Sequence, residues 1–576
     1  MPFNTLTVAL STTPTIISTL FSYPLSRQRT DNYGLSYAEG IALIRKFLIH
    51  ASHHTVEELQ AFTAMYVPRP VWVCCEPVEI ANEYCDRAAA ALVAQLGEEG
   101  VKRVGGERWW RWREGKLMGE WVWVREKWWP GAEEVKEKEP QAKTMLYVHG
   151  GAYYFGSVDE HRYQLQRHAR KIGARVFAPR YRLAPQFPFP CALYDVLACY
   201  LHLLSEQPAE SIIFAGDSAG GGLLLSILCI LRDQGLPQPA GAVLISPWVD
   251  LCHSFASVVA DSSADYIPAH GFHHRPSAAW PPRRPRKNST TGAYSDLDNE
   301  RVLKVEIDGA LLDIPDQIQL YTTNDMLRDP LVSPVNQPTL AGLCPLLILV
   351  GGGEILRDEQ VYIAHRAAFP ELFCPAGAKA AATVHLQVFP NACHVLPTLA
   401  WTRPAKRMCA SVATFAAAVF ADPSALPDFT HETVHTTTST ALPAMKPEDF
   451  PTPECIGVIT AEPVKRWLAA RRKWETKYPS TPPEGEEEEE TPETWEGERP
   501  PPSAAVLKRG TEVKGKKTEE KISEGEMKNE KGWGMSLWAG WGAKSDSRRI
   551  LEKDTEEQLQ EDEERVEEEK ERARSV

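Results

Sequence analysis

The sequence lacks the cysteine and glycine patterns that mark metal-binding and nucleotide-binding proteins. Its 12 cysteines are scattered, apart from the neighbours Cys74 and Cys75, and they form no CxxC pair and no Cys/His spacing suited to zinc. This distribution argues against a zinc site and indicates mostly buried thiols in a reducing compartment. The sequence has no GxGxxG motif, and no Lys-Ser or Lys-Thr pair follows Gly351–Gly353, which argues against a phosphate-binding loop.

Long uninterrupted hydrophobic runs are also missing. The apolar stretch around Leu6–Leu25 is broken by serines, threonines and Pro14, so it falls short of the roughly 20 consecutive apolar residues of a membrane-spanning helix. No small-residue cleavage site follows a basic opening, so a cleaved secretion signal is not expected. We therefore predict a cytoplasmic protein, and we leave open a peripheral membrane contact through its first segment, residues 1–33.

The chain carries no excess of positive charge. It has 63 Lys and Arg residues against 77 Asp and Glu residues, for a formal net charge of -14 at pH 7. A nucleic acid would be repelled by such a body unless the positive charges were gathered on one face. We therefore expect no nucleic-acid partner.

The chain has enough apolar residues for one large domain with appendages, because 43% of its 576 residues are hydrophobic. Apolar residues recur at spacings of three and four within residues 34–97, which predicts helices that could cover a pocket. Two tryptophan-rich runs, Arg108–Arg113 and Glu120–Lys127, alternate aromatic and charged residues and predict half-buried strands. We favour sheet packing for these tryptophans over a sugar- or base-stacking surface.

A different rhythm begins after the polar segment Gly131–Lys143. Short apolar runs, typical of buried strands, cover Met145–Val148, Arg175–Ala178, Ile212–Ala215, Ala242–Ile245, Leu346–Val350 and Val384–Phe389. Segments with helical periodicity lie between most of them. This alternation predicts an α/β domain over residues 34–422, with a mainly parallel sheet covered on both faces. Ligand sites in such sheets lie at the carboxyl ends of the strands.

Two regions depart from this pattern. Residues 262–296 are rich in Pro, Arg, Ser and His and predict a disordered insertion. Residues 423–576 predict a low-complexity charged tail without a core of its own. Within that tail, the aromatic cluster Trp533–Trp541 could dock on a protein partner or a membrane surface, or could be idle, and Ile550–Arg574 predicts a solvated helix.

The strongest chemical signal is the motif Gly216-Asp217-Ser218-Ala219-Gly220. It follows the apolar run Ile212–Ala215 and leads straight into the apolar helical segment Leu223–Leu231. A sharp strand-to-helix turn of the form G-x-S-x-G lifts the serine hydroxyl above the edge of a sheet, and its two glycines let the strained turn pack closely. We therefore predict Ser218 as a nucleophile, and we expect Asp217 to brace the turn or a nearby loop.

Upstream, the run Met145–Val148 ends in His149-Gly150-Gly151-Ala152. Acyl transfer needs backbone N–H groups aimed at the oxygen that becomes negative, and glycines let a chain turn these groups inward. We expect the donors of this oxyanion hole to be Gly150, Gly151 and, from the residue after the nucleophile, Ala219. We expect His149 and Ala152 to support the motif.

The acid and the base follow the serine along the chain in folds with this elbow. His394 stands just past the end of Val384–Phe389 and is the predicted base, whereas His385 lies inside that strand and is predicted to be structural. Glu354 follows the glycines after Leu346–Val350 and is the predicted acid. We prefer it to Asp358, which falls one helical turn later.

These three residues predict a two-step mechanism. His394 takes the proton of Ser218, whose oxygen attacks an ester carbonyl to form an acyl-enzyme, and water completes the second step. Glu354 holds the imidazole in the required tautomer and stabilises its charged form.

At this point the sequence resembles the hormone-sensitive-lipase-like branch of the α/β hydrolases, and in particular its fungal members. The likeness spans roughly Leu35–Asp422. It rests on His149-Gly150-Gly151, Gly216-Asp217-Ser218-Ala219-Gly220-Gly221, Tyr181-Arg182-Leu183-Ala184-Pro185, Ser246-Pro247-Trp248 and Leu356-Arg357-Asp358-Glu359. The resemblance implies an α/β-hydrolase fold with an N-terminal helical cap, an esterase, lipase or deacetylase activity, and no cofactor.

The chain departs from the pattern of that family at two positions. Ala152 stands where the family usually has a third glycine, and Glu354 stands where the acid is usually Asp. We expect a small-molecule ester or lipid substrate, with medium or long acyl chains or an acetylated sterol as candidates, because an apolar cap would enclose a hydrophobic pocket. The alternative is a non-catalytic ligand-binding or scaffold protein on the same fold, which the presence of His394 disfavours.

Overall fold

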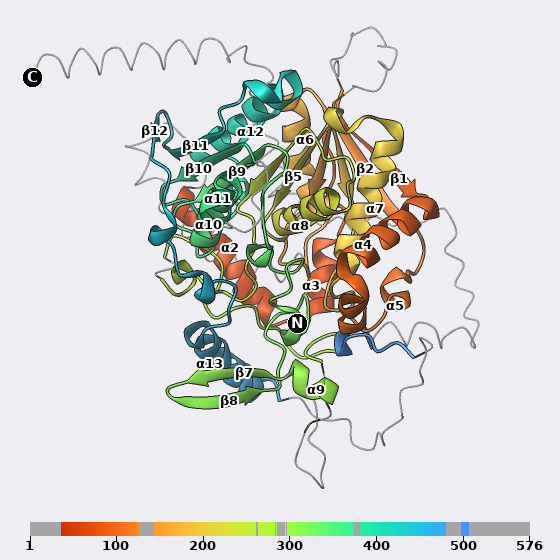
Figure 1. Ribbon diagram of the computed structural model, residues 1–576, viewed down its shortest axis with the longest axis vertical. Coiled ribbons are helices and arrows are strands. Elements are labelled where there is room, and N and C mark those ends of the chain that lie inside the picture. Colours follow the sequence, from red (N-terminus) through yellow and green to blue (C-terminus); the bar gives the residue numbers. More distant parts are fainter. Residues whose placement is uncertain are drawn as a thin grey trace, which may run out of the picture.

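The computed structural model describes residues 36–125, 143–260, 263–282, 284, 294, 296–373, 381–479 and 497–505. The predicted membrane-contacting segment 1–33, the aromatic cluster Trp533–Trp541 and the predicted helix Ile550–Arg574 lie outside these residues. Within the described part, the centre of the molecule is a ten-stranded sheet in the order β1-β2-β4-β3-β5-β6-β9-β10-β11-β12. Figure 1 shows this sheet running from β12 at one edge to β1 at the other.

The middle of the sheet is parallel and its edges are antiparallel. Neighbouring strands from β4 to β11 pair parallel, whereas the pairs β1–β2, β2–β4 and β11–β12 are antiparallel. The ten strands are β1 Val73–Ile80, β2 Leu117–Val124, β3 Thr144–Val148, β4 Arg175–Pro179, β5 Ile212–Asp217, β6 Gly241–Ile245, β9 Leu346–Gly351, β10 Val384–Phe389, β11 Phe429–Val434 and β12 Ser439–Ala441. A separate antiparallel hairpin joins β7 Leu303–Ile307 to β8 Ala310–Ile314.

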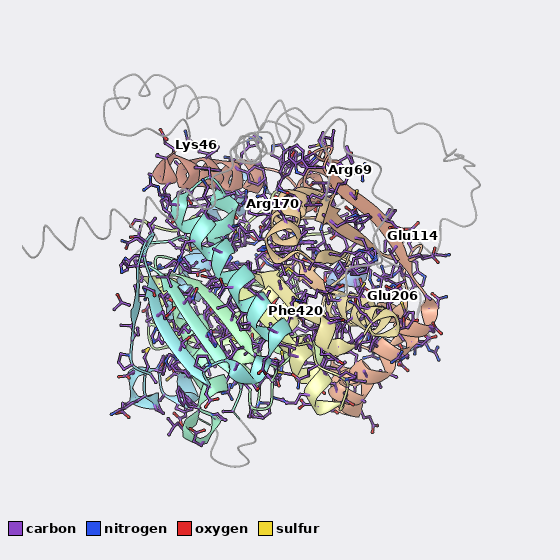
Figure 2. The ribbon with its side chains drawn as sticks, turned by 90° about the horizontal axis from the view of Figure 1, so that it is seen from above. Lys46, Arg69, Glu114, Arg170, Glu206 and Phe420 are labelled. Atoms are coloured by element: carbon purple, nitrogen blue, oxygen red, sulfur yellow. The ribbon has the colours of Figure 1, made fainter. Side chains whose placement is uncertain are left out.

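Helices cover both faces of the sheet. The longer ones are α2 Tyr37–Ser52, α3 Val56–Thr63, α4 Asn82–Arg103, α6 Val158–Ile172, α7 Cys191–Glu206, α8 Ala219–Asp233, α10 Arg357–Ala368, α12 Arg403–Ala421 and α13 Ala461–Lys477. The shorter ones are α5 Arg108–Arg111, α9 Asp296–Arg301 and α11 Pro370–Phe373. Figure 2 shows α6, marked by Arg170, beside α12, which carries Phe420, over one face of the sheet.

The apolar strands predicted from the sequence are buried because each contributes to two cores. In β3, Met145 and Tyr147 pack with α6 and α12, whereas Leu146 and Val148 pack on the opposite face with α7 and α8. Successive side chains of a strand point to opposite faces, so a strand covered on both sides is apolar throughout. The arrangement confirms the predicted α/β-hydrolase fold with its mainly parallel sheet.

The N-terminal helices lie over the carboxyl ends of the strands. Gln60 of α3 donates hydrogen bonds to the carbonyl oxygens of Tyr154 and Ala184, in the loops after β3 and β4. At its start, α2 contacts the loop after β10, where the Tyr37 hydroxyl donates to the Asn391 carbonyl oxygen over 3.3 Å. The segment 34–97 is not entirely helical, however, because β1 interrupts it and forms one edge of the sheet.

The predicted strand Arg108–Arg113 is wrong, because this run begins with the short helix α5. Its neighbours Trp109 and Trp110 are both fully buried in one core, which a strand would not allow, since consecutive side chains of a strand face opposite ways. The second tryptophan-rich run was predicted as a strand over Glu120–Lys127, and its residues Glu120–Val124 lie in β2. The interpretation of these tryptophans as packing residues is confirmed, since Trp121 of β2 is buried as well.

The predicted boundary at residue 423 is also wrong. β11 adds to the sheet beside β10 through parallel pairing, and β12 pairs with β11. Further on, α13 packs against the β7–β8 hairpin, where Val464 joins a small core with residues of that hairpin (Figure 1). β11 and α13 are folded because they pack against other parts of the domain, and the local sequence does not show these long-range contacts.

The insertion predicted to be disordered over residues 262–296 is folded along most of its first half. Residues 263–282 are described, and Asp265, His273 and His274 are buried. The Nε2 atom of His274 lies 2.9 Å from the Tyr154 hydroxyl, in the loop after β3. The segment is held by polar contacts with the rest of the domain, and such contacts leave no hydrophobic periodicity in the sequence.

The last described segment, residues 497–505, places the Glu498 side chain at the start of α5. The Glu498 carboxylate accepts hydrogen bonds from the backbone N–H groups of Glu107, Arg108 and Trp109, with N–O distances of 2.9 to 3.0 Å. A helix start leaves such N–H groups without partners in the helix, so a carboxylate there satisfies several donors at once.

Replacing this carboxylate should destabilise the domain. We expect Glu498→Ala to lower the free energy of unfolding by roughly 1–3 kcal/mol, since partly buried N–H donors lose their acceptor. Chemical denaturation measured by tryptophan fluorescence would show the change. Glu454→Ala is the matched control, because Glu454 is exposed and has no hydrogen bond to any residue that the structure describes. Equal stability of the two variants would contradict the assignment.

Candidate active site

The turn between β5 and α8 presents Ser218 in a strained backbone conformation. Its φ and ψ angles are 52° and -122°, a region that residues with a side chain rarely adopt. The turn is held by a hydrogen bond from the Ser218 N–H to the Ile245 carbonyl oxygen over 2.9 Å. A Cβ atom on Gly220 would lie 2.1 Å from the Val148 carbonyl oxygen, so only glycine permits this approach to β3. The predicted elbow is therefore present.

The structure brings together the three side chains predicted as nucleophile, base and acid. The His394 Nε2 atom lies 2.8 Å from the Ser218 Oγ atom, and the His394 Nδ1 atom lies 2.6 Å from the Glu354 Oε2 atom. All three residues are at least nine-tenths buried. The carboxylate thus fixes the orientation of the ring, and the far nitrogen of the ring faces the serine hydroxyl.

The second carboxylate oxygen of Glu354 accepts two hydrogen bonds. The Glu354 Oε1 atom accepts hydrogen bonds from the Gly351 N–H over 2.6 Å and from the Ser246 hydroxyl over 3.0 Å. That hydroxyl in turn accepts the N–H of Val395, next to the base, over 3.1 Å. In the sequence, Ser246 stands out only as part of the motif Ser246-Pro247-Trp248. Its link between the acid and the base loop depends on two contacts, each with a residue more than 100 positions away.

The two rejected candidates lie elsewhere. Asp358 accepts a hydrogen bond from the backbone N–H of Ser257 over 3.0 Å and pairs with the neighbouring Arg357. The ring of His385 lies inside β10, with its centroid 5.8 Å from that of Phe415. Neither side chain forms part of the Ser218–His394 contact.

The electrostatic surroundings favour the protonated form of His394. Burial alone would lower the pKa of this histidine, but the hydrogen bond and charge of Glu354 outweigh it, with further contributions from the charges of Asp265 and Asp217. The pKa of His394 therefore lies above its ordinary value of 6.5. The ring is poised to accept a proton from the hydroxyl that it faces.

The structure changes the predicted set of oxyanion donors. The Gly150 N–H donates to the Asp217 Oδ2 atom over 3.2 Å, so it is directed at a carboxylate and is not one of the donors. The N–H groups of Gly151, Ala152 and Ala219 donate to no acceptor in the described part of the chain. Ala152, expected only to support the motif, adopts a φ of 49° in the same loop. The candidate donors are thus Gly151, Ala152 and Ala219.

Asp217 was predicted to brace either the turn or a nearby loop, and it braces the loop that carries Gly150. Besides the Gly150 N–H, its carboxylate accepts the Tyr147 hydroxyl over 2.6 Å and lies 3.8 Å from the Nε2 atom of His161. Burial alone would lower the pKa of His161, but the Asp217 carboxylate outweighs it and raises that pKa to about 9. The neighbouring His149 stacks on Tyr181, with ring centroids 4.4 Å apart.

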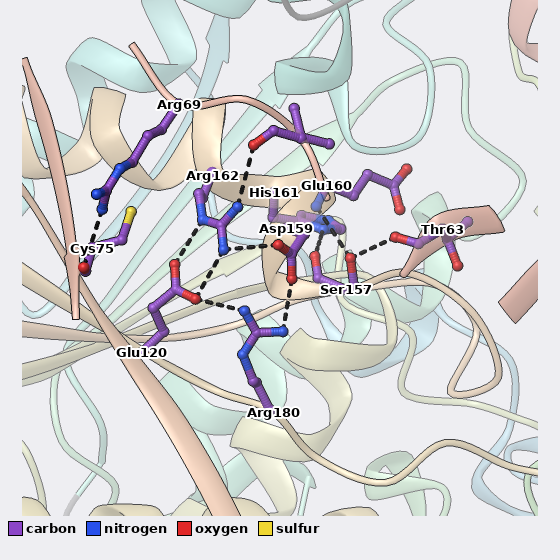
Figure 3. Close-up of polar contacts among 11 residues, drawn as sticks. Thr63, Arg69, Cys75, Glu120, Ser157, Asp159, Glu160, His161, Arg162 and Arg180 are labelled. Atoms are coloured by element: carbon purple, nitrogen blue, oxygen red, sulfur yellow. Dashed lines mark hydrogen bonds and ion pairs between the residues drawn. The ribbon is translucent and has the colours of Figure 1, made fainter. Parts of the chain in front are cut away.

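A buried ion-pair network fixes the start of α6, which carries His161 (Figure 3). Arg162 pairs with Glu120 over 2.7 Å and with Asp159 over 2.8 Å, and Arg180 pairs with the same two carboxylates over 2.5 and 2.7 Å. The four charges come from β2, α6 and the loop after β4. Two cations and two anions that alternate in this way satisfy one another in a site largely closed to water. No local sequence pattern predicts this network, because its members are up to 60 residues apart.

Neither a metal centre nor a membrane span is evident in the described part of the chain. No group of three or more His, Cys, Asp or Glu side chains there is placed to hold a metal ion. None of its helices is long and apolar enough to cross a membrane.

Comparisons with known proteins find similar chains. A family model described as an alpha/beta hydrolase fold matches residues 145–278 and 292–397. An acetyl-hydrolase of Streptomyces hygroscopicus is 35% identical over 229 residues, which is 40% of this chain and 62% of the relative. A versiconal hemiacetal acetate esterase of Emericella nidulans is 38% identical over 216 residues, 37% of this chain and 63% of the relative. The chain thus spans just under two thirds of the length of each.

A solved structure with a similar fold is that of an esterase/lipase from an uncultured bacterium. It is 24% identical to this chain, with a TM-score of 0.43, and the match covers 66% of this chain and 99% of the bacterial protein.

The reactivity of Ser218 should follow the protonation of His394. A fluorophosphonate should label Ser218 in the natural chain, at a rate that falls as the pH drops through a midpoint above 6.5, because only the neutral imidazole can accept the hydroxyl proton. Glu354→Gln removes the main cause of the raised pKa, so the midpoint should move down. The maximum rate should also fall, by roughly 10⁴-fold, as the tautomer is lost.

Labelling rates measured from pH 5 to 9 by intact mass would test this expectation. Asp358→Asn is the matched control, since Asp358 lies four residues further along and does not contact His394. A midpoint that stays unchanged in Glu354→Gln would contradict the assignment of the acid.

Proposed function

We propose that this chain, which matches a family model of the α/β-hydrolase fold and resembles the hormone-sensitive-lipase-like branch of that fold, is a serine-dependent hydrolase of carboxylic esters. The observation that carries the proposal is the pair of contacts of 2.8 and 2.6 Å that joins Ser218 to His394 and His394 to Glu354. A hydroxyl, an imidazole and a carboxylate in this order are the groups that acyl transfer requires. The narrower resemblance to fungal members stays a prediction.

In the first half of the reaction, the His394 Nε2 atom takes the proton of the Ser218 hydroxyl as the Oγ atom attacks the ester carbonyl carbon. The tetrahedral intermediate collapses when its bond to the alcohol oxygen breaks, and the His394 imidazolium gives its proton to that oxygen. The product is an acyl ester on Ser218. Throughout, Glu354 accepts the Nδ1–H of the ring and stabilises its positive charge.

In the second half, a water molecule replaces the alcohol. The water oxygen attacks the acyl carbon while His394 takes one of the water protons. His394 then gives this proton to the Ser218 Oγ atom when the acid product leaves. The negative oxygen of both tetrahedral intermediates is stabilised by the N–H groups of Gly151, Ala152 and Ala219. Donors of this kind typically contribute about 3–4 kcal/mol each to the transition state.

Glu354 in place of the usual Asp does not weaken this mechanism. The longer side chain reaches the ring at 2.6 Å, and its other oxygen is held by the Gly351 N–H and the Ser246 hydroxyl. A carboxylate fixed at both oxygens keeps the ring in one orientation, which is the role that the acid has to fill.

The chemistry of the substrate is supported by the relatives and by the residues around the site. The names of two relatives refer to acetyl or acetate groups, as does that of an ethyl acetate hydrolase of Pseudomonas putida, which is 37% identical over 113 residues. The loop after the oxyanion motif is aromatic, with Tyr153 and Tyr154 buried and Phe155 half-buried. We therefore propose acetyl esters of apolar alcohols as the preferred substrates and longer acyl esters as the second choice.

A ligand-binding or scaffold protein on the same fold is the other candidate, and the geometry disfavours it. A receptor needs no imidazole between a serine and a buried carboxylate, yet this chain holds His394 between them. A reducing, cytoplasmic compartment remains part of the proposal, supported by the fact that every cysteine in the described residues is free and most are buried. Membrane contact by residues 1–33 and partner docking by Trp533–Trp541 stay predictions.

Hydrolysis of a panel of esters would test the proposed function. The natural chain should release the acid from p-nitrophenyl and apolar-alcohol esters with acyl chains of two to sixteen carbons, and Ser218→Ala and His394→Ala should each lower kcat by roughly 10⁶-fold. Ser226→Ala is the matched control and should retain activity, since Ser226 is a buried serine of α8 that donates to the Leu331 carbonyl oxygen. Hydrolysis that survives in Ser218→Ala would rule the proposal out.

A further inference from the structure

One carboxylate outside the three proposed catalytic residues contacts two of the loops that carry them. Asp265 is 1% exposed and lies in the segment that was predicted to be disordered. Its Oδ2 atom accepts a hydrogen bond from the Ile355 N–H over 2.9 Å, and its Oδ1 atom accepts one from the His394 N–H over 3.1 Å. The N–H of its neighbour Tyr266 also donates to Oδ1, over 2.8 Å.

Through these partners, the position of Asp265 affects both the acid and the base of the site. Ile355 follows Glu354 directly, and the second partner is the backbone of the base itself. A single rigid carboxylate therefore sets the spacing between the acid loop and the base loop. The base loop needs such support, because Asn391 and Val395 hold φ angles of 54° and 43°, which cost energy in residues with side chains.

The same segment is fastened to the N-terminal helix α2. The Arg45 guanidinium donates from Nε to the Asp265 carbonyl oxygen over 2.7 Å and from Nη2 to the Ser263 carbonyl oxygen over 2.8 Å. At the start of the same helix, the Tyr37 hydroxyl accepts the N–H of Cys393, next to the base, over 2.6 Å. Helix α2 therefore holds the base loop directly through Tyr37 and indirectly through Asp265.

We propose that Asp265 is a positioning residue for the Glu354–His394 pair, and that Arg45 of α2 holds it in place, so that the docking of the N-terminal helix sets the geometry of the base. This inference rests on the proposed ester hydrolysis, since it concerns the same site. Asp265 touches neither the substrate nor the reacting atoms, and it acts through the backbone of two loops.

The charge of Asp265 gives the proposal a second, independent readout. Burial lowers the pKa of His394, while three carboxylates around the ring, Glu354, Asp265 and Asp217, raise it. Loss of the Asp265 charge should therefore move the acidic midpoint of kcat/KM to lower pH. A residue with a merely structural role would change stability without this movement.

The test is Asp265→Asn in the full chain. Both oxygens of Asp265 accept backbone N–H groups. In the variant, the NH₂ group of the new amide would face one of these N–H donors, and the repulsion should shift the loop that carries the donor. We expect kcat to fall by about 10²-fold, the effect of a small displacement of a catalytic group, with KM unchanged and the acidic midpoint lowered. Kinetics from pH 5 to 9, with the melting temperature recorded in parallel, would measure all three.

Asp329→Asn is the matched control. Asp329 is also a buried carboxylate that accepts a backbone N–H, that of Leu331 over 3.0 Å. Its other partner is Arg103, and neither residue lies in the loops that carry Ser218, Glu354 and His394. It should lower the melting temperature and leave kcat and the midpoint as they are. Unchanged kcat and midpoint in a folded Asp265→Asn would overturn the proposal, and so would an equal loss of activity in Asp329→Asn.

Arg45→Met decides the matter if Asp265→Asn does not fold. It leaves the carboxylate in place and removes the bonds to the Ser263 and Asp265 carbonyl oxygens, so kcat should fall at unchanged KM, and an unchanged kcat would overturn the proposal. Failure of the proposed function can be distinguished from failure of this inference. If the proposed function is wrong, the natural chain itself hydrolyses no ester.

Discussion

The site depends on one imidazole ring held between two buried oxygen atoms. His394 reaches Ser218 with one nitrogen and Glu354 with the other, over 2.8 and 2.6 Å. The three residues come from the ends of β5, β9 and β10, so their distances are set by the order of strands in the sheet. Each remaining feature of the site can be understood as a means of keeping this ring in place or of using the proton that it receives.

Two groups of contacts surround the ring, one on each side. On the nucleophile side, Asp217 ties the elbow to the Gly150 loop and is backed by His161 and the ion pairs at the start of α6. On the acid side, Ser246 and Asp265 join the loop of Glu354 to that of His394. The hydrogen bonds in both groups run largely to backbone atoms, so they fix the paths of the loops that carry the reacting side chains.

Much of this could be predicted from the sequence, because the relevant signals are local. The apolar strands were identified from short hydrophobic runs, and Ser218, Glu354 and His394 stand directly after such runs, where a parallel sheet places functional residues. The preference for Glu354 over Asp358 also followed from its distance to the strand end. The structure places His394 in contact with both Ser218 and Glu354, in the predicted order.

What the sequence did not reveal depends on long-range contacts. Asp265 lies in a polar segment whose composition resembles disorder, and only its partners in two distant loops show why it is buried. The predicted tail boundary at residue 423 is too early, because β11 pairs with β10 of the sheet and α13 packs against the β7–β8 hairpin. The motif predicts Gly150 as an oxyanion donor because nothing in it shows that Asp217 accepts the Gly150 N–H.

The central claim is that Ser218 carries the acyl group between the two halves of the reaction. Mixing the natural chain with an activated acetyl ester, quenching in acid within milliseconds and mapping the peptides by mass would test it most directly. The account predicts one acetyl group on the peptide that contains Ser218, formed no more slowly than the acid product is released. Release of the product with no acyl group on Ser218, or with the group on another residue, would contradict it.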